Sequence, residues 1–288
     1  MRYVLFVYHF YSSPSLSSEL ILVLTLVTHP STGSVLYLQT IYPDNTPLPT
    51  SLLLFGSGAQ IQSHAHLITQ TYPTIRRVTI VARSRSARLS KLESTLNELW
   101  RERDDPVDLV LRVNGESGWK VEDEVRAAEV IVTATPSTIP LFSAEAINAS
   151  PSPSPNTDPQ ELKTIILIGS YKPHMLEIPP SIITDLLAAG AKITVDSREA
   201  CLAEAGELQG LKGGDVVELG ELLGSEDVEV RGNERLNSVR SGRVRVFKSV
   251  SLGISRFIAL EPNQTDGRRR ARGTRWGLLF KTWRWRIP

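Results

Sequence analysis

A short apolar run at residues 52–55 ends in Gly56-Ser57-Gly58, and a segment that can form a helix follows at residues 59–71. This order predicts a buried parallel strand that turns sharply into a helix. At such a turn Gly56 allows the tight bend, and Gly58 allows a phosphate to approach the backbone closely. The pattern therefore predicts a dinucleotide-binding fold, although Gly-x-Gly also occurs in plain turns.

The start of the expected helix completes this phosphate site. Ala59 and Gln60 lie in its first turn, where backbone N–H groups have no partner within the helix and the helix dipole is positive. We expect the pyrophosphate of a dinucleotide to bind against residues 56–60.

Apolar, β-branched runs alternate with helical segments further along the chain. Runs typical of strands occupy residues 76–83, 107–113, 130–136, 164–169 and 192–196. This alternation predicts an α/β fold with a doubly wound parallel sheet of the Rossmann type. The single cysteine, Cys201, lies in an expected helix and is interpreted as a buried structural thiol in a reducing, cytoplasmic compartment.

The end of the second strand bears on the choice of cofactor. A site for NAD(H) places Asp or Glu there, against the ribose hydroxyls. This chain has Arg83, Ser84 and Arg85 instead, and its next carboxylate in sequence is Glu93. Two guanidinium groups and a hydroxyl suit a 2′-phosphate, so NADP(H) is favoured over NAD(H). The alternative is a solvated turn with incidental arginines.

The end of the fourth strand is expected at the same edge of the sheet as the glycine loop. Because the fourth strand is expected beside the first, Thr133, Thr135, Pro136 and Ser137 are predicted to face the cofactor. Ordinary turn chemistry is an equally common reason for such a sequence.

The loop after the fifth strand contains the densest group of potential acids and bases in the chain. Of these, Lys172 and His174 are our candidates for orienting a substrate or relaying a proton. A loop histidine without a catalytic role is the alternative for His174. No metal site is predicted, because His64 and His66 fall on different faces of their helix.

The two ends of the chain are harder to interpret. A two-strand hairpin is expected near the amino terminus, with strands at residues 19–28 and 35–39 and a turn at residues 29–34. Residues 148–160 form a low-complexity loop. Residues 267–288 hold eight of the 32 Lys and Arg residues and no acid. We interpret this tail as disordered; binding of nucleic acid or an anionic membrane is the disfavoured alternative, because no binding fold accompanies it.

Five motifs in order resemble the ornithine cyclodeaminase/mu-crystallin family, in its fungal branch. They are residues 56–60, 133–137, 169–175, 195–200 and 246–249, and the resemblance covers about residues 51–255. It implies hydride transfer between a nicotinamide and a small imino or amino acid, in a homodimer whose second domain holds the substrate. It also implies cofactor contacts at Gly169, Ser170 and Ser249.

The departures from that family matter for activity. Tyr171 stands where cyclodeaminases have a catalytic Asp, so ornithine cyclisation is not expected. The family's Arg and Lys that grip the substrate carboxylate have no counterpart, since no Arg or Lys lies between Arg2 and Arg76. Two hypotheses result: an NADP(H)-dependent imine reductase or amino-acid dehydrogenase, and a catalytically silent nucleotide-binding protein.

The expected organisation has four parts. Residues 1–50 are a remnant of the substrate and dimerisation domain, which leaves a curtailed second α+β domain. Residues 51–215 form the NAD(P)-binding domain, residues 216–260 return toward the substrate domain, and residues 261–288 form the basic tail.

Overall fold

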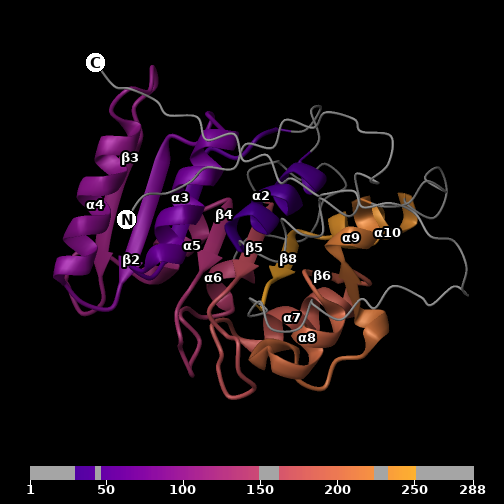
Figure 1. Cartoon of the computed structure of the whole chain (residues 1–288). Coiled ribbons are helices and arrows are strands. Elements are labelled where there is room, and N and C mark those ends of the chain that lie inside the picture. The colour runs from indigo at the N-terminus through magenta and orange to yellow at the C-terminus, as the bar shows by residue number, and fades with distance from the viewer. Residues whose placement is uncertain (1–29, 43–46, 149–161, 224–232, 251–288) are drawn as a thin grey trace, which may run out of the picture. The chain divides into compact units, whose positions relative to one another are not determined.

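Eight parallel strands form one sheet in the computed structural model, which describes residues 30–42, 47–148, 162–223 and 233–250 (Figure 1). The strands are β1 (Ser51–Phe55), β2 (Arg77–Ala82), β3 (Asp108–Val113), β4 (Val130–Thr133), β5 (Lys163–Leu167), β6 (Ile193–Val195), β7 (Val216–Glu218) and β8 (Val244–Lys248). Their order across the sheet is β3-β2-β1-β4-β5-β8-β6-β7. The expected doubly wound, Rossmann-type sheet is therefore confirmed.

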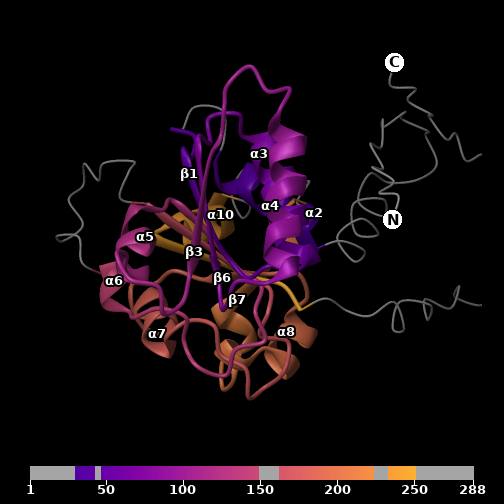
Figure 2. The same cartoon turned by 90° about the vertical axis from the view of Figure 1, so that its left-hand side faces the viewer.

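Helices cover both faces of this sheet, as the two views in Figures 1 and 2 show. Alternate residues of each strand point to opposite faces, so that Leu52 and Leu54 of β1 enter one core and Leu53 and Phe55 enter the other. The first core is completed by α2 (Pro30–Ile41), α3 (Ala59–Thr71), α4 (Ala87–Trp100) and α9 (Leu219–Leu223). The second is completed by α5 (Val121–Ala127), α6 (Glu145–Asn148), α7 (Pro180–Ala188) and α8 (Arg198–Glu204).

Three short helical elements complete the described chain: the 3-10 helices η2 (Gly206–Leu208) and η3 (Gly213–Asp215), and α10 (Asn233–Arg240). No described helix has the length and apolar character that a membrane crossing requires.

The prediction of a hairpin near the amino terminus is wrong for the residues that the structure describes. Residues 30–41, expected as a turn and a strand, form helix α2. Ser34, Tyr37, Leu38 and Ile41 are all buried, and their spacing places them on one helical face. The apolar run after the expected turn suggested a strand at residues 35–39, but the helical period accounts for the burial.

The carboxyl end of α2 is held by two arginines from distant parts of the sequence. Arg240 of α10 donates to the Thr40 carbonyl at 2.5 Å, and Arg245 of β8 donates to the Ile41 carbonyl at 3.3 Å. The last carbonyls of a helix lack partners within it and lie at the negative end of its dipole, where cations are stabilising. These contacts fix α2 against the sheet.

The segment expected to return toward a second domain supplies strands to this sheet. β7 pairs with β6, and β8 lies between β5 and β6. The sheet thus extends to Lys248, beyond the expected boundary at residue 215, and the described residues contain no second sheet. The expected strand at residues 19–28, the loop at 149–160 and the basic tail lie outside the described residues.

Candidate functional site

The turn between β1 and α3 has the geometry expected of a phosphate-binding loop. Gly56 has φ +124°, and a Cβ there would lie 3.1 Å from the Ala134 carbonyl oxygen. Gly58 caps α3 with φ −90°, and a Cβ there would meet no atom of the described residues within 4 Å. The cap makes no side-chain hydrogen bond, and the N–H groups of the first turn have no partner within the helix.

The end of β2 carries the exposed residues Arg83, Ser84 and Arg85. Arg85 forms a two-pronged ion pair with Glu116, with Nε to Oε1 at 2.7 Å and Nη2 to Oε2 at 3.2 Å. Ser86 caps α4 by accepting from the Leu89 N–H. The basic turn is therefore solvent-accessible, and one of its two arginines already has a carboxylate partner.

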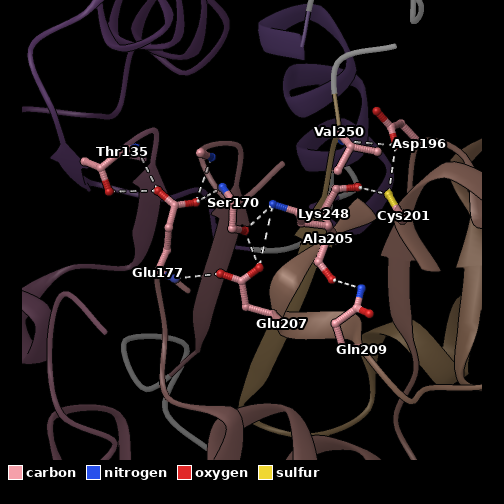
Figure 3. Close-up of polar contacts among 11 residues, drawn as sticks. Thr135, Ser170, Glu177, Asp196, Cys201, Ala205, Glu207, Gln209, Lys248 and Val250 are labelled. Atoms are coloured by element: carbon pink, nitrogen blue, oxygen red, sulfur yellow. Dashed lines mark hydrogen bonds and ion pairs between the residues drawn. The ribbon is translucent and has the colours of Figure 1, made fainter. Parts of the chain in front are cut away.

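A buried carboxylate joins the ends of β4 and β5. Glu177 Oε1 accepts from the Thr135 N–H at 2.7 Å and from the Thr135 hydroxyl at 3.1 Å (Figure 3). Its Oε2 accepts from the N–H groups of Gly169 at 2.7 Å and Ser170 at 3.1 Å. Burial raises the pKa of Glu177, and the nearby Lys248 ammonium opposes that shift. Both oxygens are committed to holding the two strand ends together.

A second buried cluster is hydrogen-bonded to the backbone N–H of Glu177. Lys248 Nζ donates to the Ser170 hydroxyl at 2.6 Å and lies 3.8 Å from Glu207 Oε2 (Figure 3). The Ser170 hydroxyl donates to the same Glu207 oxygen, and Glu207 Oε1 accepts from the Glu177 N–H at 2.7 Å. The Lys248 and Glu207 side chains are both fully buried. This cluster connects β8 and the η2 region to the loop after β5.

Asp196 makes a similar junction at the end of β6. Its carboxylate accepts from the Ser249 hydroxyl at 2.6 Å, the Ser197 N–H at 2.8 Å and the Cys201 thiol at 3.1 Å. Burial raises the pKa of Asp196 and also that of Cys201. A buried thiol with a raised pKa is a poor nucleophile, which agrees with the structural interpretation of Cys201.

The chain is similar to several known proteins in sequence and in fold. No protein-family model matches. A Delta(1)-pyrroline-2-carboxylate reductase of Bacillus cereus is 31% identical over 139 residues, which are 46% of this chain and 35% of that protein. An uncharacterized cyclodeaminase of Dictyostelium discoideum is 24% identical over 214 residues, 73% of this chain and 56% of that one. The chain thus spans between about a third and a little over half of these relatives' length.

The names of these relatives are consistent with the resemblance of the five ordered motifs to the ornithine cyclodeaminase/mu-crystallin family. The fold is similar to that of a probable ornithine cyclodeaminase from Bordetella pertussis, whose crystal structure matches with a TM-score of 0.54 and 22% identity, over 76% of this chain and 58% of that chain.

The structure brings together three of the predicted segments. Gly56 lies against Ala134 and Thr135, and a Cβ at Gly169 would collide with the Thr135 backbone at 2.1 Å. The glycine loop and the ends of β4 and β5 therefore form one continuous edge. Pro136 is exposed there, and the half-buried Ser137 accepts the Leu176 N–H at its carbonyl.

The other predicted residues divide into exposed and buried groups. Lys172 and His174 are exposed, and the Lys172 ammonium lies 5.8 Å from the centroid of the Tyr171 ring. Ser170 and Ser249 are buried, and their hydroxyls donate to Glu207 and Asp196. Gly169 and Thr133 are buried as well. Lys172 and His174 are thus accessible to a substrate, whereas Ser170 and Ser249 hold the strand ends together.

Sequence reasoning missed Glu116, Glu207 and Lys248. Lys248 gave one signal, because a lysine at the end of an apolar strand needs a buried partner, but its partner lies in a distant segment. Glu116 gave no signal near Arg85, because the two are 31 residues apart and meet only through the pairing of β2 with β3.

A pocket of about 360 Å³ lies elsewhere, between the carboxyl ends of α3 and α4. Its lining includes His66, Thr69, Trp100 and Arg103. It lies at the opposite edge of the sheet from the glycine loop and contains none of the predicted site residues, so we assign it no part in the site.

Proposed function

We propose that this chain binds a nicotinamide dinucleotide across the carboxyl edge of its sheet, with its pyrophosphate at residues 56–60. The observation that carries this proposal is the amino terminus of α3, where the N-cap residue Gly58 has no side chain to bind the N–H groups of the first turn. Free N–H groups and the positive end of the helix dipole suit a pyrophosphate at that position. Thr135, Pro136 and Ser137 would line the adjoining part of the crevice, where strand order reverses between β1 and β4.

NADP(H) is the preferred cofactor in this proposal. Arg83, Ser84 and Arg85 are exposed at the end of β2, next to the strand that carries the glycine loop. Guanidinium groups bind phosphate oxygens through paired hydrogen bonds, so a 2′-phosphate fits this turn better than a free ribose hydroxyl does.

The proposed reaction is hydride transfer to or from a small imino or amino acid, carried out by a homodimer. When bound, the reduced cofactor would supply a hydride to the imine carbon, while a proton reaches the nitrogen. Lys172 and His174 are exposed on the loop after β5 and are our candidates to orient the substrate or relay that proton. The substrate class follows the relative named as a pyrroline-2-carboxylate reductase.

A catalytically silent nucleotide-binding protein is the second candidate. A specific observation favours it, namely that no Arg or Lys lies between Arg2 and Arg76, where the family's carboxylate clamp belongs. An imino-acid carboxylate would then have no cation from that segment to bind it.

Turnover of cyclic imino acids distinguishes the two candidates. We expect the purified chain to oxidise NADPH with Delta(1)-pyrroline-2-carboxylate, and we expect Lys172→Ala/His174→Ala to slow turnover about 100-fold while NADPH still binds. Tight NADPH binding without turnover of any imino acid would favour the silent protein. Unchanged turnover in the double variant would remove the assigned roles of Lys172 and His174.

A further inference from the structure

Arg85 and Glu116 meet at the edge where the ribose of a dinucleotide would lie. Arg85 follows β2 and Glu116 follows β3, and the two strands remain paired as far as Ala82 and Val113. The side chains form the two-pronged contact described above, at 2.7 and 3.2 Å. Both are accessible to solvent, with 69% of the Arg85 side chain and 39% of the Glu116 side chain exposed. A ligand can therefore reach this pair and compete for it.

The pair has opposite consequences for the two forms of the cofactor. A 2′-phosphate that takes the Nε and Nη2 donors of Arg85 displaces Glu116, and one that takes the remaining donors binds beside it. In both cases the Glu116 carboxylate repels the phosphate. A free 2′-hydroxyl carries no charge that a carboxylate repels, and carboxylates at the end of the second strand accept from it in NAD(H) sites. Glu116 therefore opposes the preference that Arg83 and Arg85 create.

We propose that Glu116 is a specificity-determining residue that limits the preference for NADPH over NADH by occupying Arg85. This inference rests on the proposed function, because it requires a dinucleotide at the glycine loop. An exposed ion pair is weak, because water screens both charges, so a phosphate can break it. Glu116 thereby lowers the preference for NADPH without abolishing NADPH binding.

The test compares dissociation constants for NADPH and NADH in the wild-type chain and in Glu116→Gln. We expect Glu116→Gln to tighten NADPH binding about three- to tenfold without tightening NADH binding, because it removes one exposed ion pair and one repulsion across water. We expect this gain to shrink at high salt, which screens exposed charges. Arg85→Gln should weaken NADPH binding and leave NADH binding within twofold.

Glu98→Gln is the matched control. It removes the same charge from another exposed pair, Glu98 with Arg101, at the carboxyl end of α4 and the opposite edge of the sheet. It should change neither dissociation constant. An unchanged NADPH constant in Glu116→Gln, or equal gains for both cofactors, would overturn the role of Glu116 while leaving the proposed function intact. A wild-type chain that binds neither cofactor would overturn both.

Discussion

Charged side chains that water does not reach hold the carboxyl edge of the sheet together. Lys248 and Glu207 are fully buried and share the Ser170 hydroxyl, and Glu177 binds the backbone of both neighbouring strand ends. Removing one member of a buried ion pair leaves the other charge uncompensated in a medium of low dielectric constant. We therefore expect substitutions of these residues to lower the stability of the fold.

Lys248→Met tests that expectation. The substitution keeps an unbranched side chain of similar length but removes the cation, so the free energy of unfolding should fall by about 3–5 kcal/mol in urea denaturation. Lys248→Met/Glu207→Gln should recover part of this loss, because the buried negative charge is removed as well. Lys172→Met, at an exposed position, serves as the control and should change stability by less than about 0.5 kcal/mol. A loss below about 1 kcal/mol in Lys248→Met would show that the buried pair is not needed.

His64 makes stability depend on pH. It is fully buried on α3, where Nδ1 contacts the Gln60 carbonyl at 2.7 Å and Nε2 contacts the Ser34 hydroxyl at 2.9 Å. Burial lowers its pKa to about 4, so between the unfolded pKa near 6.5 and the folded pKa the unfolded chain binds more protons. Stability is therefore lost as pH falls through that window, by an amount on the order of 3 kcal/mol.

The measurement is the free energy of unfolding at neutral pH and at about pH 4.5, well inside that window. The fall should be smaller in His64→Gln, which cannot take up the proton, than in the wild type. His66→Gln, which alters a half-buried histidine on the same helix, should retain most of the pH dependence. Equal pH dependence in the wild type and His64→Gln would contradict this role of His64.

Single residues also show how far the sequence could be interpreted. The roles of Gly56 and Gly58 follow from a strand and a helix adjacent in sequence, so local reasoning predicted their geometry. The Arg85–Glu116 and Lys248–Glu207 pairs depend on which strands become neighbours, and no local pattern encodes that. Glu177 lies in the loop after β5, where the sequence places many ionisable groups, but only the structure shows that both its oxygens bind backbone N–H groups.

At the scale of elements, α2 is the clearest departure from the sequence prediction. Its sequence combines β-branched and aromatic residues with a proline and a glycine, so local propensity favoured a turn and a strand. Tertiary packing decides otherwise. Tyr37 stacks on Phe247 of β8 at a centroid distance of 5.0 Å, and Ser34 contacts His64 of α3. Both partners are distant in sequence, so they were invisible to local reasoning.

Tyr37→Ala measures how much α2 contributes. Tyr37 is fully buried, so its truncation should lower the free energy of unfolding by about 3–5 kcal/mol. Gln39→Ala, at an exposed position of the same helix, should cost less than about 0.5 kcal/mol. Similar stabilities for the two variants would show that α2 does not pack on the sheet as described.

At the scale of the whole described molecule, the parallel sheet is what makes a dinucleotide site possible. Strand order reverses between β1 and β4, and the glycine loop opens at that point. Alternating strands and helices were sufficient to predict this arrangement. They were not sufficient to show that β8 inserts between β5 and β6, because that insertion brings together segments far apart in sequence.

Calorimetric titration with NADPH, in the wild type and in Gly58→Val, tests the central claim most directly. Gly58 has φ −90° and open space around an added Cβ, so valine is compatible with the fold but fills the space proposed for the phosphate. We predict that the wild type binds NADPH and that Gly58→Val, folded by circular dichroism, binds about 100-fold more weakly, which corresponds to the loss of one or two charge-assisted hydrogen bonds. Equal affinity in the two proteins, or no binding by the wild type, would contradict a dinucleotide site at the glycine loop.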